Sequence, residues 1–180
     1  MLTKTILATT LLLGTSYSAV AQEETPSKPA ALEFLQGSLG VWDAEMEVWP
    51  GGPDADSIKF KGVETNRAYG EYWMASDFDS EVQGQTMRLH TIIGYDLEKK
   101  ALVGTIIDQG PYAASMTGEY DAATKTVRWE TQARAADGTP MLQKTTMTQE
   151  SPDERVLVLT VPGPEDTPTK FMQINFTKRP

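Results

Sequence analysis

The chain has 180 residues, no cysteine, a single histidine and a formal net charge of −9 at pH 7. This length is typical of one domain. The lack of cysteine excludes disulfides, thiolate metal sites and a cysteine nucleophile, and one histidine excludes bis-histidine haem and histidine-rich zinc sites. The acidic balance argues against nucleic acid as a partner, because phosphate binding requires a basic surface.

The first 21 residues have the pattern of a secretory signal peptide. Lys4 supplies a positive n-region, residues 6–13 form a short apolar run, and residues 19–21 (Ala-Val-Ala) form a small-x-small cleavage site. The run is too short for a membrane anchor, which needs about 20 residues. We therefore expect a signal peptide over 1–21, a flexible lead-in over 22–30 and no membrane span. A secreted chain without disulfides fits a bacterial periplasm or exterior better than a eukaryotic secretory pathway.

One short helix is expected at the start of the folded part, followed only by strands and turns. Residues 31–35 favour one or two helical turns ending at Gly37, and no later stretch keeps a 3.6-residue period over a helical length. Apolar and polar residues instead alternate, as they do from Trp42 to Val48. The alternating stretches predict about ten strands, over residues 42–48, 58–69, 72–78, 86–95, 101–108, 113–120, 126–134, 141–149, 155–161 and 170–178.

The turns between these strands are short, which indicates an antiparallel meander. Two of them share a Tyr-Asp start, and Asp96 and Asp121 are expected to accept hydrogen bonds from backbone N–H groups two residues on. A meander of about ten strands without covering helices hides its edges by closing or by folding into a two-sheet sandwich. We predict an all-β fold, an antiparallel up-and-down β-barrel in one domain over residues 31–180, with the helix capping one end. The sandwich is the alternative.

A Gly-x-Trp motif stands at the head of the first expected strand, from Gly40 to Trp42. It resembles the signature of lipocalins and related calycin barrels. The resemblance implies that the Trp42 ring packs across the closed end of the barrel, under a basic residue from the last strand.

A wider resemblance covers nearly all of the chain after the leader. Its motifs are Leu-Gly-Val-Trp-Asp-Ala-Glu over 39–45, Gly-Val-Glu-Thr-Asn-Arg over 62–67, Trp-x-x-Ser-Asp-Phe over 73–78, and the two Tyr-Asp turns. In that order they resemble a family of bacterial secreted β-barrel proteins known only as a domain of unknown function. The resemblance implies a fold and a compartment but no activity. Many members carry bulky apolar residues where this chain has His90 and Gln109.

The residues that we expect at a ligand site are Trp42, Glu64, Arg67, Arg88 and His90. Glu64 and Arg67 share a strand in which Gly62 could form a β-bulge. With strict alternation Glu64 and Asn66 face inward, whereas a bulge would turn Arg67 inward instead. A charge inside the barrel needs a partner or a ligand. Both structural pairing and anchoring of a carboxylate ligand remain open.

Arg88 and His90 share one alternation phase with Ile92. In a one-sided sheet the polar phase faces water, so both polar residues would lie on the outer wall. Alternatively, Ile92 marks an inward face, which would bring His90 into a semi-polar cavity suited to an anionic amphipathic ligand. No cofactor is expected. Similar-looking haem-binding barrels carry their proximal histidine late in the chain, and no histidine follows His90 here.

Three acidic residues, Asp77, Asp79 and Glu81, alternate along one strand face. They could contribute to a calcium site or form a solvated outer face. Calcium needs six or more oxygens, and no neighbouring segment supplies the rest, so the solvated face is favoured and no metal is expected. The chain has no Gly-x-Ser-x-Gly motif and no phosphate loop. No catalytic residue is assigned.

The leading functional hypothesis is a binding module. A closed barrel of about this size leaves room for one small apolar or amphipathic ligand. An enzyme of unrecognised type using the same cavity, and a filled barrel with a structural role in the envelope, are the alternatives. The negative charge and the lack of a free sheet edge predict a monomer, or at most a weak dimer.

Overall fold

The structure is a computed structural model and describes residues 29–135, 137–162 and 167–180. The expected signal peptide, and the lead-in up to residue 28, lie outside the described residues. Among the described residues, no helix is long and apolar enough to cross a membrane.

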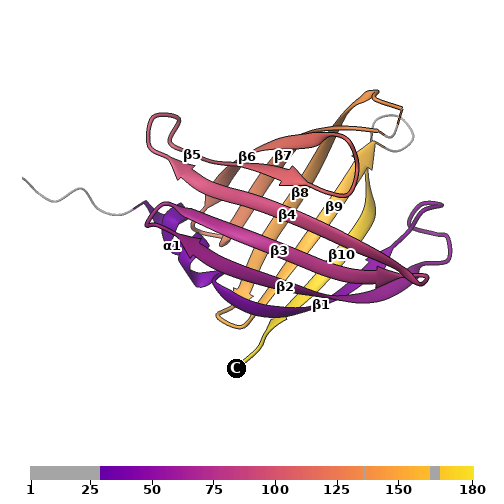
Figure 1. The fold of residues 1–180 in the computed structure, drawn as a ribbon, viewed down its shortest axis with the longest axis horizontal. Helices are drawn as coiled ribbons and strands as arrows, with labels where there is room; N and C mark the ends of the chain where they lie inside the picture. The colour runs from indigo at the N-terminus through magenta and orange to yellow at the C-terminus, as the bar shows by residue number, and fades with distance from the viewer. Residues whose placement is uncertain (1–28, 136, 163–166) are drawn as a thin grey trace, which may run out of the picture.

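The described part of the chain contains one helix, α1 (Ala30–Gly37), and ten strands (Figure 1). The strands are β1 (Gly40–Val48), β2 (Ile58–Tyr69), β3 (Trp73–Val82), β4 (Gln85–Asp96), β5 (Ala101–Ile107), β6 (Ala113–Asp121), β7 (Thr126–Arg134), β8 (Pro140–Ser151), β9 (Glu154–Pro162) and β10 (Pro168–Lys178).

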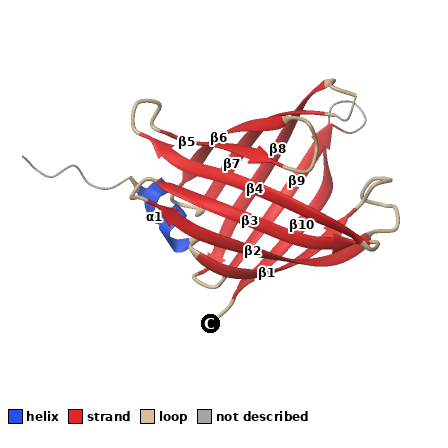
Figure 2. Ribbon diagram, viewed as in Figure 1, coloured by secondary structure: helices blue, strands red, loops and turns tan. Residues whose placement is uncertain are grey.

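These strands form one closed antiparallel barrel (Figure 2). Each strand pairs with its neighbours in sequence, and β1 closes the ring by pairing with both β2 and β10. Closure satisfies the backbone groups that a free edge would expose. The predicted up-and-down barrel is confirmed, and the alternative of a two-sheet sandwich is wrong.

The helix α1 lies across one end of the barrel, which we call the closed end. Its apolar residues are buried against the inner wall, where they join Leu102 and Val127, neither of which is exposed. Leu32 and Leu35 are among them, with exposed fractions of 1% and 3%. Burial of this face stabilises a helix that is too short to be stable alone. The predicted cap is therefore present.

Strict alternation decides which side chains enter the barrel. Along β1, Trp42, Ala44 and Met46 are buried, and the intervening Asp43 and Glu45 are exposed. The antiparallel registers carry this phase from strand to strand around the ring. The inner face of each strand therefore follows from the successive registers that link it to β1, with irregularities between Lys170 and Met172 and between Gln149 and Ser151.

Gly62 is not a bulge, and the alternative in which a bulge turned Arg67 inward is wrong. The pairing of β2 with β1 and with β3 runs through Gly62 without a register shift. The glycine instead leaves room for an aromatic ring, because a Cβ at this position would lie 2.5 Å from Cζ of Phe78. Glu64 and Asn66 consequently face inward, and Arg67 faces outward.

Candidate functional site

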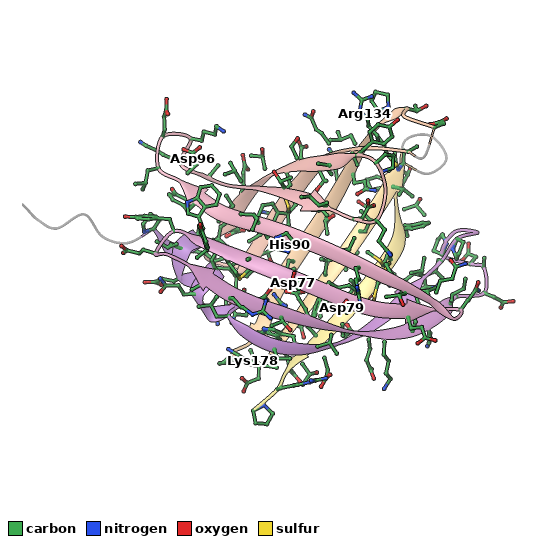
Figure 3. All side chains as sticks on the ribbon, viewed as in Figure 1. Asp77, Asp79, His90, Asp96, Arg134 and Lys178 are labelled. Carbon is green, nitrogen blue, oxygen red and sulfur yellow. The ribbon has the colours of Figure 1, made fainter. Side chains whose placement is uncertain are left out.

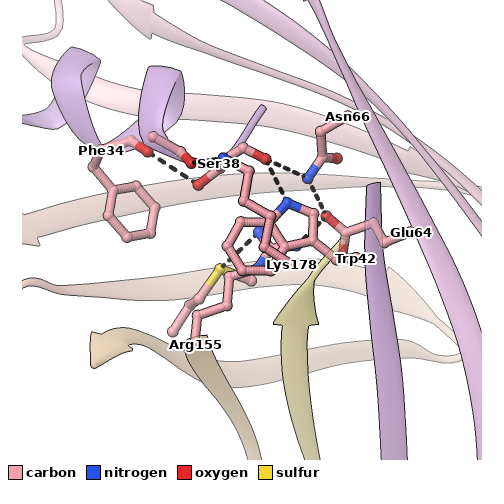
Figure 4. A network of polar contacts seen from close by, with 9 residues as sticks. Phe34, Ser38, Trp42, Glu64, Asn66, Arg155 and Lys178 are labelled. Atoms are coloured by element: carbon pink, nitrogen blue, oxygen red, sulfur yellow. Dashed lines mark hydrogen bonds and ion pairs between the residues drawn. The ribbon is translucent and has the colours of Figure 1, made fainter. Parts of the chain in front are cut away.

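The closed end contains a buried ion pair. Arg155, at the start of β9, donates through Nη2 to Oε1 of Glu64 on β2 at 2.7 Å. The two side chains are only 2% and 10% exposed. The Nδ2 group of Asn66 donates to the same oxygen of Glu64 and to the backbone carbonyl of Ser38 (Figure 4). The inward charge of Glu64 therefore has a structural partner, which sequence alone had left open.

Trp42 lies at the closed end and is not exposed to solvent. We call the buried cluster of Trp42, Glu64, Asn66 and Arg155 the floor of the barrel. Its Nε1 donates to the Ser38 carbonyl at 2.9 Å. The guanidinium of Arg155 lies 4.3 Å from the ring, and Nζ of Lys178 lies 5.3 Å from it. Cations over an indole face are attracted by its negative potential. The predicted packing of Trp42 under a basic residue of the last strand is confirmed, and Arg155 is an addition that the motif did not predict.

Two atoms of the floor have no hydrogen-bond partner among the described residues, Oδ1 of Asn66 and Nε of Arg155. Nη1 of Arg155 donates to Sδ of Met147 at 3.8 Å, and Nε1 of Trp42 and Nδ2 of Asn66 both donate to the carbonyl of Ser38. The charge of Arg155 is thus neutralised by Glu64. The arrangement closes the barrel and supplies neither a nucleophile nor a free base.

The other three expected site residues lie on the outer wall, Arg67 on β2 and Arg88 and His90 on β4. Figure 3 shows His90 beside Asp77 of β3. Arg67 donates to Oδ2 of Asp77 at 2.6 Å, and Nδ1 of His90 lies 2.7 Å from the other oxygen of the same carboxylate. Arg88 bonds to Asp79 at 3.0 Å. The hydrogen bonds from His90 and then Arg67 hold the pKa of Asp77 below its ordinary value.

The alternative that placed His90 inside the barrel is wrong. Leu89 and Thr91 take the inward positions of β4, so Ile92 does not mark an inner face. The site for an anionic ligand that depended on an inward His90 therefore has no geometric basis. Within the described ranges, no three His, Asp or Glu side chains come close enough to hold a metal ion.

The opposite end of the barrel contains a cavity of about 520 Å³. We call this end the mouth; the β1–β2, β3–β4 and β5–β6 connections lie there. Its lining consists of apolar residues and of uncharged polar ones: Val48, Ile58, Phe60, Val82, Met87, Gln83, Gln85, Thr86 and Gln109. The volume lies within the range of pockets that hold small organic molecules.

The inner wall between the mouth and the floor is not filled by apolar side chains alone. Leu89 and Thr91 on β4, Thr145 on β8 and Leu157 on β9 face the barrel axis, and each is half-buried. Inward residues that keep part of their exposure indicate that solvent reaches past the mouth. The inner wall thus offers both hydroxyl and apolar contacts to a molecule in the barrel.

A smaller cavity of about 170 Å³ lies at the closed end, between α1 and the β2–β3 hairpin. Leu32, Leu35 and Met74 contribute to its apolar lining, and Trp73 covers one side. No ionisable group except Glu71 lines it. Its volume is about a third of that of the mouth cavity, which makes the mouth the stronger candidate.

The family described as "Protein of unknown function (DUF1579)" matches residues 27–178. The chain belongs to this family. The match confirms the expected membership of a family without an assigned function, and it covers the helix and all ten strands. The chain matches no curated protein.

Two solved structures have the same fold as this DUF1579 protein. The crystal structure of Rv2717c from M. tuberculosis is 12% identical, with a TM-score of 0.61, and the match covers 83% of this chain and 98% of that one. The S-type phycobiliprotein lyase CPES from Guillardia theta is 11% identical, with a TM-score of 0.56, and the match covers 83% and 92%. At such low identity the likeness shows the lipocalin-like barrel alone.

The mouth of the DUF1579 barrel was not predicted as a site. Ile58, Phe60 and Met87 alternate with charged or polar neighbours, as core residues of any half-buried strand do. Gln109 lies in a Gly-Pro turn and had been noted only as a departure from the family. One signal was present in the sequence, because apolar residues at the very ends of strands have no core to enter unless the barrel mouth provides one.

Proposed function

We propose that this DUF1579 protein is a secreted or periplasmic binding protein that holds one small apolar or amphipathic ligand in the mouth of its barrel. The observation that carries this proposal is the cavity of about 520 Å³ with an apolar wall and an uncharged polar rim. Ligand sites are typically concave, mostly apolar and supplied with a few polar groups.

The two ends of the barrel support a single direction of entry. The closed end is occupied by the apolar face of α1, by Trp42 and by the Glu64–Arg155 pair, all of them buried. Among the described residues, the single helix is α1, and no helix lies across the mouth (Figure 2). A ligand would enter there and place its apolar part against Ile58 and Phe60.

Cavity filling tests the proposal. Met87 lines the cavity and its neighbour Arg88 lies on the outer wall, so Met87→Trp and Arg88→Trp add the same ring on opposite sides of one strand. We expect Met87→Trp to weaken binding of the neutral probe N-phenyl-1-naphthylamine at least tenfold and Arg88→Trp to leave it unchanged. Equal affinities in two folded variants would contradict the proposal. Native mass spectrometry of protein from its own cells would show a retained ligand directly.

One of the solved structures with the same fold is named as a phycobiliprotein lyase. An enzyme can therefore be built on this architecture, and catalysis in the cavity is the alternative to binding alone. The described cavity lining contains no ionisable side chain that could act as an acid or base. This favours binding. A retained ligand that is released unchanged after incubation supports the binding role, whereas a chemically altered one supports the enzyme.

Export is part of the proposal and is supported by the leader pattern of residues 1–21. Cell fractionation should place the chain outside the cytoplasm, and sequencing of the exported form should begin at Gln22. A cytoplasmic chain that keeps Met1 would contradict this part of the proposal.

We further propose that the protein is a monomer. The barrel has no free edge, and like net charge opposes association. Sedimentation at low micromolar concentration should give the mass of one chain. A tight dimer would contradict it.

A further inference from the structure

We infer that the ligand carries an uncharged, hydrogen-bonding head group. The rim of glutamines at the mouth, Gln83, Gln85 and Gln109, selects this head group. This inference rests on the proposed binding function and specifies the class of ligand. It replaces the anionic ligand that an inward His90 would have implied.

The first argument is the chemistry of the cavity lining. Five of its residues are apolar and four are Gln or Thr, so none of them is ionisable. An amide offers two donors and an acceptor, and a hydroxyl offers one donor and two lone pairs. Such groups satisfy an alcohol, an amide or an ester. They cannot compensate a buried full charge, which needs an opposite charge or a dense shell of hydrogen bonds.

The second argument concerns the cations inside the barrel. Arg155 is paired with Glu64 at the closed end. Lys178 lies at the same end, where Nζ donates to the carbonyl of Gly37 at 3.3 Å and lies over the ring of Trp42. Neither cation lines the mouth cavity. A carboxylate head in the mouth would therefore find no cationic partner in the lining.

The third argument concerns the charges around the mouth. Asp54 and Asp56 are exposed in the β1–β2 connection, Glu81 precedes a lining residue of β3, and Asp108 precedes Gln109. These carboxylates repel an approaching anion at low ionic strength.

Three cations also lie near the mouth, and all three are engaged. Arg134, at the end of β7, lies 5.9 Å from the ring of Tyr112 and donates to the carbonyl of Gly138 at 2.8 Å. Lys170 is held over the ring of Trp49 at 4.3 Å and donates to Gln173 at 3.0 Å. Lys59 is paired with Glu47 at 3.4 Å on the outer wall. A cationic head group would be attracted by the exposed carboxylates around the mouth, but no carboxylate lines the cavity to receive it.

The test compares three head groups on one fluorescent polyene chain: parinaryl alcohol, parinaric acid in its ionised form at pH 8, and the corresponding primary ammonium. We expect the native protein to bind the alcohol at least tenfold more tightly than either charged form. Gln85→Arg places a cation at the rim and should reverse the order of alcohol and acid. Gln132→Arg, on the exposed outer wall of β7, is the matched control and should leave the order unchanged.

The outcomes separate the inference from the proposed function. If the acid or the ammonium binds as tightly as the alcohol, the uncharged head group is wrong and the binding function stands. If Gln132→Arg reverses the order as Gln85→Arg does, the selection does not come from the rim and the inference is wrong. If none of the three forms binds the native protein, the binding function itself is wrong, and the inference with it.

Discussion

Arg155 and Glu64 are 91 positions apart in the chain and form an ion pair of 2.7 Å across the floor of the barrel. They belong to β9 and β2, which are not neighbours, because β10 and β1 lie between them in the ring. The pair therefore joins the late and early halves of the barrel through its interior. Such a contact is made only once the ring is closed.

Removal of one partner should destabilise the fold strongly, because the other charge is then buried without compensation. Arg155→Met should lower the free energy of unfolding by about 3–5 kcal/mol. Combining Arg155→Met with Glu64→Gln should recover part of that loss, since Gln keeps an acceptor for Asn66 and removes the unpaired charge. Urea denaturation of the single and double variants measures both effects. Losses that simply add would contradict a coupled pair.

Trp42 should contribute more to stability than any exposed aromatic residue. Its side chain is completely buried and its ring contacts Arg155, so Trp42→Ala should cost about 3–5 kcal/mol. Trp73→Ala is the control, because that ring is 39% exposed, and it should cost less. Denaturant melts of the native protein and of both variants measure these losses in the free energy of unfolding. A loss below about 1 kcal/mol for Trp42→Ala would show that the floor tolerates a large cavity.

Local features made the fold predictable from sequence. The two Tyr-Asp turns form as expected, because Asp96 accepts from the backbone of Glu98 and Asp121 from that of Ala123. The alternation of β1 gave its buried face without reference to any partner. Short turns then left only closure or a sandwich as ways to hide the edges.

Features that depend on distant partners were less predictable. Gly62 is compatible with a bulge or with an aromatic neighbour, and only the position of Phe78 decides between them. Arg155 is the second of two charged residues that begin an ordinary strand, and nothing near it in sequence marks it as buried. The mouth cavity is formed by ends of strands that meet only in the closed barrel. These features follow from the register around the ring, which sequence periodicity does not give.

A glycine beneath an aromatic ring on the inner wall supplies a further test. Gly118 lies under Trp129, and a Cβ at this position would come within 2.5 Å of the ring. Because Trp129 is itself buried, Gly118→Ala should overpack the core and cost about 1–3 kcal/mol. Gly37→Ala is the control, since the nearest atom there would be at 3.5 Å, an ordinary contact. Thermal melts in which both variants match the native protein would contradict the close fit at Gly118.

On the outer wall, Arg67 and His90 both bond to the carboxylate of Asp77, and these contacts predict how the carboxyl group of Asp77 titrates. A carboxylate can only accept, so His90 donates to Asp77 through Nδ1–H, and Arg67 donates to the other oxygen. These bonds hold the pKa of Asp77 below its ordinary value of 3.8, and the bond from His90 has the largest effect. Because the pKa is lowered on folding, the ionised carboxylate stabilises the protein above pH 3.8, and this contribution is lost as the pH falls through the folded value.

His90→Gln should therefore raise the pKa of Asp77 toward 3.8, and Arg67→Gln should raise it by less. The measurement is an NMR titration of the Asp77 carboxyl carbon. Lys144→Gln, on β8, removes a charge whose partner is Glu130 and should leave the titration of Asp77 unchanged. The stabilities of the native protein and His90→Gln should differ at neutral pH and converge in acid, where Asp77 is protonated in both. A titration of Asp77 that is the same with and without His90 would show that this hydrogen bond is not kept in solution.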